Sequence, residues 1–223
     1  MHKKEQSLKL LIHQKILPLY YTDDIIVSEE ILNSLYEAGI RMVEYTARGS
    51  NALSNFKMLK GLAHKEMPEM QLGIGTIKNV RQATEFMNAG ADFVVCPIIN
   101  RQVGQMVHKA GLLWIPGCMS TTEIATAEEE GAEIVKIFPG NILGPSYIAA
   151  IRELFPDLKF MPTGGVEPEE NNLRNWFNSG VTAVGMGSKL VSKEVINNKN
   201  YDLLKEQTKK AMEIVEKIFM ARP

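Results

Sequence analysis

The feature that most limits the fold of this chain is an alternation of short apolar runs with longer amphipathic segments. The segments between the runs, such as residues 28–39 and 79–90, have the length and polarity of surface helices. Strands that alternate with helices form βαβ units and a parallel sheet. Eight runs have the strand pattern: residues 16–21, 40–45, 71–76, 92–97, 112–116, 133–139, 158–164 and 182–187.

A glycine precedes every second run and divides it from the helical segment before it. These glycines are Gly39, Gly90, Gly131 and Gly180. Glycine adopts the left-handed conformation that ends many helices, so each position predicts a helix stop. Eight βα repeats favour closure into a barrel, with an open doubly wound sheet as the alternative. We therefore predict an α/β chain that forms a (β/α)8 TIM barrel, as a single domain over residues 1–223 with an N-terminal helix.

Composition excludes several classes of partner. The 223 residues carry a formal net charge of −1, so no basic field favours nucleic acid or an anionic membrane. No window approaches the length of an apolar membrane span, and the first residues lack the apolar core of a signal peptide. Cys96 and Cys118 have no partner spacing that predicts a disulfide or a nucleophile. We expect a soluble, cytoplasmic protein with reduced thiols.

Two charged residues lie inside predicted strands, Lys136 in the sixth and Glu44 in the second. Side chains alternate between the two faces of a strand, so if Val135 and Val43 face the helices, both charges face the interior. Both also lie near the carboxyl ends of their strands, where barrel active sites are built. A structural ion pair is the alternative, as is an assignment of faces that is wrong by one residue.

Interior placement of these two groups points to imine chemistry. Burying an unpaired ammonium is costly, and the neutral amine is the form that attacks a carbonyl. A nearby carboxylate supplies the acid–base steps of carbinolamine dehydration and carbon–carbon cleavage. Lys136 and Glu44 are therefore our candidates for a nucleophile and a general acid/base.

Two glycine-rich segments follow the seventh and eighth strands, at residues 162–165 and 185–188. Barrels often bind phosphate between these two loops, where glycines let backbone amides approach the oxygens. Ser188 adds a hydroxyl donor. The alternative is that the glycines only make tight turns. A phosphate site here would let a nearly neutral protein bind an anionic substrate.

The chain also resembles a known family, 2-keto-3-deoxy-6-phosphogluconate (KDPG) aldolase, whose members often act on 2-keto-4-hydroxyglutarate (KHG) as well. The combination of E-x-T-x-R, G-x-G-T, K-x-F-P and P-T-G-G carries the resemblance. The similar stretches occur in the family's order and cover roughly residues 16–191. They are residues 38–53, 73–79, 91–97, 116–124, 134–148, 161–166 and 184–191.

The resemblance implies a role for each matching position. It makes Lys136 the imine-forming residue and Glu44 the general acid/base. It places a phosphate at Gly164, Gly165, Gly187 and Ser188. It assigns the remaining contacts with substrate to five residues: Arg48 and Thr76 at the pyruvyl carboxylate, Thr163 as a further hydroxyl, and Pro97 and Phe138 at the pocket wall. It also implies a homotrimer that needs no metal and no cofactor.

Several of these positions have simpler explanations. Arg48 also fits a solvated loop arginine, and Thr76 also fits an N-cap for the helix that starts near Asn79. Lys189 follows Ser188 where some relatives carry Trp, and either supports phosphate or is a solvated helix lysine. The four histidines, His2, His13, His64 and His108, lack the spacing that places two metal ligands on one face.

The sequence as a whole predicts a class I aldolase that cleaves KDPG to pyruvate and glyceraldehyde 3-phosphate. The nearest alternatives are the same chemistry on the galactonate epimer or on 4-hydroxy-2-oxoglutarate. A sugar-phosphate isomerase or epimerase would need acid–base groups but no imine. A non-catalytic sugar-phosphate binding protein would leave the interior lysine and glutamate without a purpose.

Overall fold

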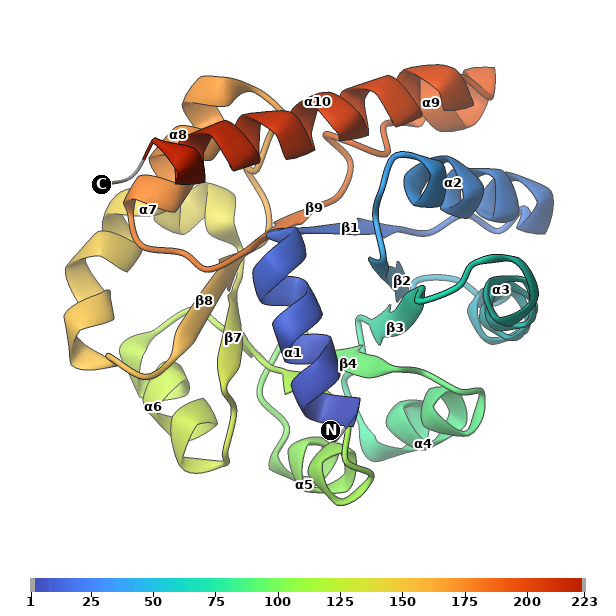
Figure 1. Ribbon diagram of the computed structural model, residues 1–223. Coiled ribbons are helices and arrows are strands. Elements are labelled where there is room, and N and C mark those ends of the chain that lie inside the picture. The colour runs from blue at the N-terminus through green and yellow to red at the C-terminus, as the bar shows by residue number, and fades with distance from the viewer. Residues whose placement is uncertain (1–2, 222–223) are drawn as a thin grey trace.

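Parallel strands separated by helices make up the computed structural model, which describes residues 3–221 (Figure 1). The strands are β1 (Ile16–Tyr20), β2 (Met42–Thr46), β3 (Gln71–Gly75), β4 (Phe93–Val95), β5 (Leu113–Ile115), β6 (Gly117–Cys118), β7 (Ile134–Ile137), β8 (Lys159–Pro162) and β9 (Val184–Met186). The helices are α1 (Lys3–Gln14), α2 (Ile25–Glu37), α3 (Ala52–Glu66), α4 (Val80–Asn88), α5 (Arg101–Lys109), α6 (Thr121–Glu129), α7 (Gly140–Ile151), η1 (Arg152–Leu154), α8 (Glu170–Asn178), α9 (Lys193–Asn198) and α10 (Tyr201–Met220). The predicted βα alternation is confirmed.

The strands form two parallel sheets rather than one uninterrupted ladder. Six strands pair in the order β5-β4-β3-β2-β1-β9, and three pair in the order β6-β7-β8. The two sheets meet at two seams. At one, the chain passes from β5 through Pro116 into β6, and the ladder of β6 with β7 begins at the hydrogen bond from the Lys136 amide to the Pro116 carbonyl, 2.8 Å. At the other, an isolated parallel bridge joins Thr163 to Gly185, and the Thr182 amide donates to the Phe160 carbonyl at 3.0 Å. The sheets therefore curl toward each other, but the predicted closure is incomplete at the level of strand pairing.

Proline explains one of the two interruptions. Pro116 separates β5 from β6, which begins at the next residue, so the predicted fifth strand is divided in two. Because proline has no backbone N–H, it cannot donate to a ladder and commonly breaks a strand. The eight predicted runs thus correspond to β1–β5 and β7–β9, with β6 as a short continuation of β5.

The predicted helix stops are confirmed. Gly39, Gly90, Gly131 and Gly180 have φ values of 103°, 92°, 81° and 99°. This region suits glycine because an L side chain there meets its own backbone. Each glycine turns the chain from a surface helix directly into the next strand. The carboxyl ends of the strands are thereby kept on the opposite side of the molecule from these turns.

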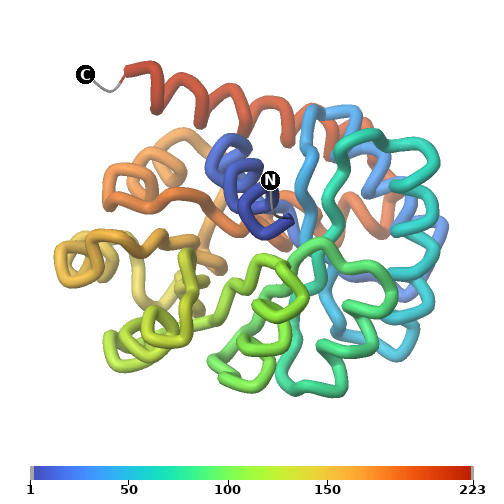
Figure 2. The backbone as a smooth tube through the Cα atoms, turned by 60° about the horizontal axis from the view of Figure 1, so that its bottom comes forward, coloured from blue at the N-terminus to red at the C-terminus, as the bar shows by residue number. Residues whose placement is uncertain are grey.

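The interior of the curled sheet is filled at the amino ends of the strands. Met42, Phe93, Ile134 and Met161 belong to one buried cluster that also includes Leu11 of α1. Figures 1 and 2 show α1 lying across that end of the strands. The predicted N-terminal helix is confirmed, and it closes the interior at the amino ends of the strands.

The two faces of the strands are assigned correctly by the alternation argument. Met42 and Ile134 lie in the interior cluster, whereas Val43 and Val135 lie in the separate cluster between the strands and the helices. Lys136 shares the parity of Ile134. It therefore faces the interior, two residues closer to the carboxyl end of β7.

The last helix runs along the outside of the molecule. α10 packs against α2 and α8, which covers the region where β1 meets β9 (Figure 1). Within residues 3–221, no helix has both the length and the apolar character needed to cross a membrane.

Candidate active site

Lys136 and Glu44 meet inside the curled sheet from two distant strands. The Lys136 Nζ lies 3.7 Å from the Glu44 Oε1, and their side chains are 6% and 0% exposed. Lys136 comes from β7 and Glu44 from β2, so the pair spans the interior. The lysine nitrogen does not point into solvent, and its close charged neighbour is a carboxylate.

The Glu44 carboxylate is buried without hydrogen bonds. Both of its oxygens are inaccessible, and neither accepts a hydrogen bond from any residue that the structure describes. A Cβ added at Gly75 would overlap the Glu44 Oε1, so the glycine makes the space that the carboxylate occupies. Buried polar groups in proteins nearly always have partners, and an exception marks a place where a ligand or water belongs.

Thr163 repeats this arrangement at the end of β8. Its hydroxyl is buried and has no partner among residues 3–221. It packs against the backbone of Gly185, where an added Cβ would overlap the Thr163 Oγ1. In both cases an interior polar side chain lies against a glycine of the neighbouring strand. Because neither glycine has a side chain, each leaves space in the interior for a polar side chain whose atoms have no hydrogen-bond partner in the described structure.

A cavity of about 340 Å³ opens at the carboxyl ends of the strands. Pockets of this size accommodate small metabolites. Seven of the predicted site residues line it: Arg48, Phe138, Thr163, Gly164, Gly165, Gly187 and Ser188. Lys136 and Glu44 lie outside this lining, and Phe138 connects the lysine to it, with 5.3 Å between the Lys136 Nζ and the ring centroid.

The loop after β8 is held in shape by α8. Gly164 and Gly165 have φ values of 94° and 71°, which few other residues adopt. The Gly165 carbonyl accepts hydrogen bonds from the Asn172 side chain at 3.0 Å and from the Trp176 indole at 3.2 Å. The sequence identified the glycines, but nothing local to Asn172 or Trp176 indicated that they support this loop.

Thr76 and Pro97 do not line the cavity. Thr76 directly follows β3 and Pro97 lies two residues after the end of β4, and both are partly buried. Thr76 has a φ of 65°, an uncommon conformation for a β-branched residue, and such strain often occurs at functional sites. The N-cap of α4 is Asn79, whose side chain accepts from the Gln82 amide at 3.0 Å. The capping explanation for Thr76 is therefore wrong.

Three further residues line the cavity: Tyr21 and Lys193, which had no role predicted from sequence, and Lys189, predicted either to support phosphate or to be a solvated helix lysine. Tyr21 lines it and hydrogen-bonds to Asp23. Lys189 and Lys193 line it from the turn after β9 and from the start of α9. Lys189 is exposed, but it lies in a turn and not in a helix. Alternation within strands cannot find these residues, because they lie outside the strands.

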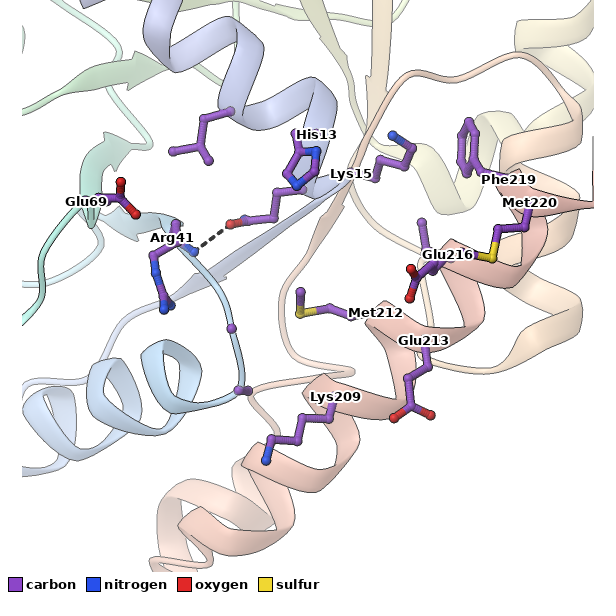
Figure 3. Close-up of a pocket in the computed structure, with 15 residues that line it drawn as sticks. His13, Lys15, Arg41, Glu69, Lys209, Met212, Glu213, Glu216, Phe219 and Met220 are labelled. Atoms are coloured by element: carbon purple, nitrogen blue, oxygen red, sulfur yellow. Dashed lines mark hydrogen bonds between the residues drawn. The ribbon is translucent and has the colours of Figure 1, made fainter.

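A second cavity, of about 880 Å³, is lined by a separate set of residues (Figure 3). It is formed between α1 and α10, with Lys15, Arg41, Met212 and Phe219 in its lining, and it contains none of the predicted site residues. Its position at the amino ends of the strands separates it from Lys136. We therefore place the candidate active site at the smaller cavity.

Neither cysteine lines the site cavity, nor do His13, His64 and His108, and His2 lies outside the described residues. Burial raises the pKa of Cys96 and of Cys118 to about 12, so both remain protonated fillers. In the part of the chain that the structure describes, no three His, Cys, Asp or Glu residues are grouped so as to hold a metal ion.

Comparison with known proteins gives a family for this arrangement. The model of the KDPG and KHG aldolase family matches residues 8–207. The 2-dehydro-3-deoxy-phosphogluconate aldolase of Pseudoalteromonas atlantica is 31% identical over 198 residues, which cover 88% of this chain and 89% of that protein. The 2-dehydro-3-deoxy-6-phosphogalactonate aldolase of Escherichia coli is 37% identical over 120 residues, which cover 53% of this chain and 58% of that protein.

The solved structures agree. The KDPG aldolase of Legionella pneumophila, captured with pyruvate as a covalent carbinolamine intermediate, superposes with a TM-score of 0.84 at 26% identity, covering 94% of this chain and 98% of that one. The family match, the Pseudoalteromonas relative and the fold shared with the Legionella enzyme extend over nearly the whole described chain. The chain belongs to the KDPG and KHG aldolase family.

Proposed function

We propose that this aldolase cleaves 2-keto-3-deoxy-6-phosphogluconate through a Schiff base on Lys136. The observation that carries the proposal is the buried pair of Lys136 and Glu44, 3.7 Å apart, next to a cavity that the two glycine loops line. A shielded amine with a neighbouring carboxylate is what imine chemistry requires.

The enzyme binds the substrate at its two charged ends, the phosphate and the carboxylate. The phosphate occupies the loops of Gly164, Gly165, Gly187 and Ser188, where backbone amides and a hydroxyl donate to its oxygens. Arg48 and Thr76 hold the carboxylate of the pyruvyl part, which a guanidinium binds through two parallel hydrogen bonds. Phe138 and Pro97 form the walls. The keto carbon is thereby placed near the Lys136 Nζ.

Cleavage then proceeds in covalent steps. The Lys136 amine adds to the C2 carbonyl, and loss of water gives an iminium. Glu44, through a water molecule, removes the proton of the C4 hydroxyl. The electrons of the C3–C4 bond move to the iminium, so glyceraldehyde 3-phosphate leaves and an enamine remains. Protonation at C3 and hydrolysis release pyruvate and regenerate the amine, which divides one high barrier into smaller ones.

The proposal extends to the architecture. The two sheets form one (β/α)8 barrel in a single domain over residues 1–223, supported by the passage of the chain from β5 through Pro116 into β6 at one seam and by the Thr163–Gly185 bridge at the other. Assembly as a homotrimer and a cytoplasmic location stay predictions.

Related substrates are the second candidates. The name of the Escherichia coli relative supports the galactonate epimer, and the name of a solved structure at 27% identity includes 4-hydroxy-2-oxoglutarate aldolase. All three substrates yield pyruvate through the same imine. Comparing kcat/KM for the three acids separates them.

Borohydride reduction in the presence of pyruvate tests the imine directly. Only an imine is reduced to a stable adduct, so we expect the added mass on the peptide that contains Lys136. The matched variant Lys136→Met should form no adduct and cleave no substrate, while its circular dichroism matches the wild type. Wild-type protein that cleaves substrate without adduct would exclude the imine route. It would then favour acid–base chemistry on the same barrel.

A further inference from the structure

The charged side chains among the described residues that line the cavity at the glycine loops are all positive. Arg48, Lys189 and Lys193 are part of its lining, and among the residues that the structure describes it includes no carboxylate. The whole chain has a formal net charge of −1. The positive charge is therefore local to this cavity, where it attracts an anion over a range of about 10 Å at moderate salt.

The two lysines differ in their surroundings. The Lys189 Nζ lies 2.5 Å from the Glu167 Oε1, and this contact raises the pKa of Lys189. Its charge is thereby largely compensated by a carboxylate on the loop after β8. Lys193 forms no ion pair within 4.0 Å in the described part of the chain. Of the two, Lys193 has the uncompensated charge.

The backbone of Lys193 is held firmly although its side chain is exposed. It is the first residue of α9. The preceding residue, Ser192, is the N-cap, and its Oγ accepts a hydrogen bond from the Val195 amide at 3.1 Å. Val195 is fully buried and attaches this short helix to the core. A bound anion therefore has to order only one lysine side chain, which lowers the entropy cost of the contact.

We propose that Lys193 binds the terminal anionic group of the substrate and sets the preference for phosphorylated over unphosphorylated keto acids. This inference rests on the function proposed above. A phosphate monoester carries a charge of about −1.5 to −2 at pH 7, whereas the distal group of 4-hydroxy-2-oxoglutarate is a single carboxylate on a shorter chain. An uncompensated cation in the cavity lining favours the phosphate, which has the higher charge and the longer reach.

Steady-state kinetics of three variants test the assignment. Lys193→Gln removes the charge, Lys193→Arg retains it, and Lys109→Gln removes an exposed charge from the end of α5, away from the cavity. For Lys193→Gln we expect the ratio of kcat/KM for KDPG to that for 4-hydroxy-2-oxoglutarate to fall about tenfold, as for the loss of one charged hydrogen bond in a partly exposed site. The change should appear in the KM for KDPG, with Lys193→Arg and Lys109→Gln near the wild-type ratio.

Salt dependence provides a second readout. Raising the NaCl concentration should increase the KM for KDPG less steeply in Lys193→Gln than in wild type, because one screened contact is missing. An unchanged substrate ratio in Lys193→Gln, or an equal loss for both substrates, would overturn the assignment.

Calorimetry with inorganic phosphate separates this proposal from the proposed function. It measures the anion site in the resting enzyme and needs no turnover. We expect wild type and Lys109→Gln to bind phosphate alike and Lys193→Gln to bind it about tenfold more weakly. Weakened phosphate binding without any borohydride adduct in wild type would retain Lys193 and reject the imine. An adduct with undiminished phosphate binding in Lys193→Gln would do the reverse.

Discussion

Gln14 and Glu44 are buried polar side chains at opposite ends of the same interior, and they differ in how well they are satisfied. The Gln14 amide donates to the carbonyls of Ile16 and Met42 at 2.6 and 2.8 Å, and its oxygen accepts from the amides of Arg41 and Met42 at 2.7 and 3.0 Å. The Glu44 carboxylate, two residues further along β2, accepts no hydrogen bond in the described structure.

The comparison contrasts a polar side chain that stabilises the fold with one that is available for chemistry: Gln14 binds the start of β2, and Glu44 lies near its carboxyl end. At the amino end, every hydrogen-bonding group of Gln14 joins α1 to the start of β1 and β2, which strengthens the closed end of the interior. At the carboxyl end, Glu44 lies in space that Gly75 leaves open. An interior polar group that the protein does not satisfy is available for a substrate or water, and barrels place their chemistry at this end.

The largest expected effect comes from removing the charge of Glu44. Glu44→Gln keeps the shape but cannot take a proton, so kcat should fall by a factor of about 10² to 10⁴, the range for a general acid/base. Any loss of stability should come from the ion pair with Lys136 and not from a hydrogen bond, because the carboxylate accepts none in the described structure. A coupled assay of pyruvate release measures kcat, and urea unfolding measures stability. If the variant instead unfolds easily while its folded fraction keeps full activity, the pair is structural.

A smaller loss is expected from filling the space beside Glu44. In Gly75→Ala the new Cβ forces the carboxylate to move, and a displacement of about 1 Å can cost a factor of about 10² in rate. The control is Gly61→Ala in α3, where an added Cβ meets nothing within 4 Å. That variant should keep its activity and gain about 0.5–1 kcal/mol of stability from a more favourable helix residue. Equal kcat in the two variants would contradict the role of Gly75.

The opposite end should respond in stability alone. Gln14→Met fills a similar volume but leaves two amides and two carbonyls without their partners, so unfolding in urea should become easier by about 2 kcal/mol. The kcat of the folded protein should be unchanged, since α1 lies away from the site. A loss of kcat at full stability would show that the two ends are coupled, and the contrast with Glu44 would fail.

The parts of this structure that the sequence predicts are those that depend on local periodicity. Alternation within β7 placed Lys136 in the interior, and positive φ values at Gly39 and Gly180 follow from glycines at helix ends. Both features depend on neighbours within a few residues. The glycine loops were found for the same reason, because their residues are adjacent in the chain.

The parts that the sequence does not predict depend on contacts between distant segments. The strand break at Pro116 is visible locally, yet whether the two sheets pair across it depends on how β7 approaches. The contact of Trp176 with Gly165 and the position of Lys193 at the cavity are set by the packing of α8 and α9. No spacing in the sequence specifies such contacts. The positive φ of Thr76 was also unexpected, since a β-branched residue disfavours it.

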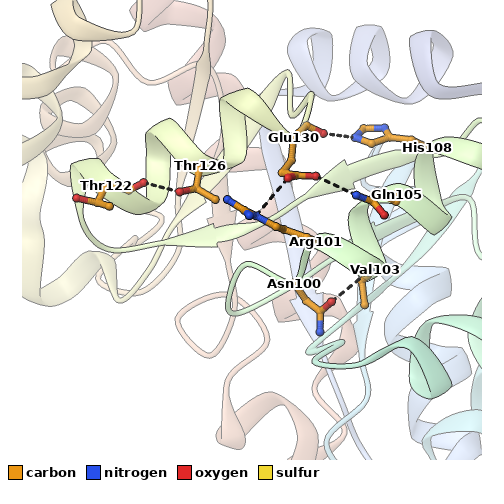
Figure 4. Close-up of polar contacts among 8 residues, drawn as sticks. All are labelled: Asn100, Arg101, Val103, Gln105, His108, Thr122, Thr126 and Glu130. Carbon is orange, nitrogen blue, oxygen red and sulfur yellow. Dashed lines mark hydrogen bonds and ion pairs between the residues drawn. The ribbon is translucent and has the colours of Figure 1, made fainter.

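The smallest expected effect concerns pH and the amino end of the strands. The His108 Nε2 lies 3.1 Å from the Glu130 carbonyl, beside the ion pair of Arg101 with Glu130 (Figure 4). Burial lowers the pKa of His108 from its ordinary value of 6.5, with a further contribution from the positive charge of Lys4. The Glu130 backbone contact and the nearby charges of Glu130 and Glu133 act in the opposite direction.

Whether the unfolding free energy rises or falls with pH depends on whether the folded or the unfolded protein binds the His108 proton first. Above pH 6.5 the histidine is neutral in both states, and its contribution to stability is complete. As the pH falls below 6.5 the unfolded chain takes up a proton before the folded protein does, so the unfolding free energy decreases. In His108→Gln, which keeps a donor for Glu130, this part of the decrease between pH 7 and the folded pKa should vanish. Urea unfolding across that range measures it, and the pH profile of kcat/KM should coincide with that of wild type, because His108 lies on α5 and outside the cavity. A shifted activity profile would mean that protonation at the closed end reaches Lys136, and the division between the two ends of the interior would no longer hold.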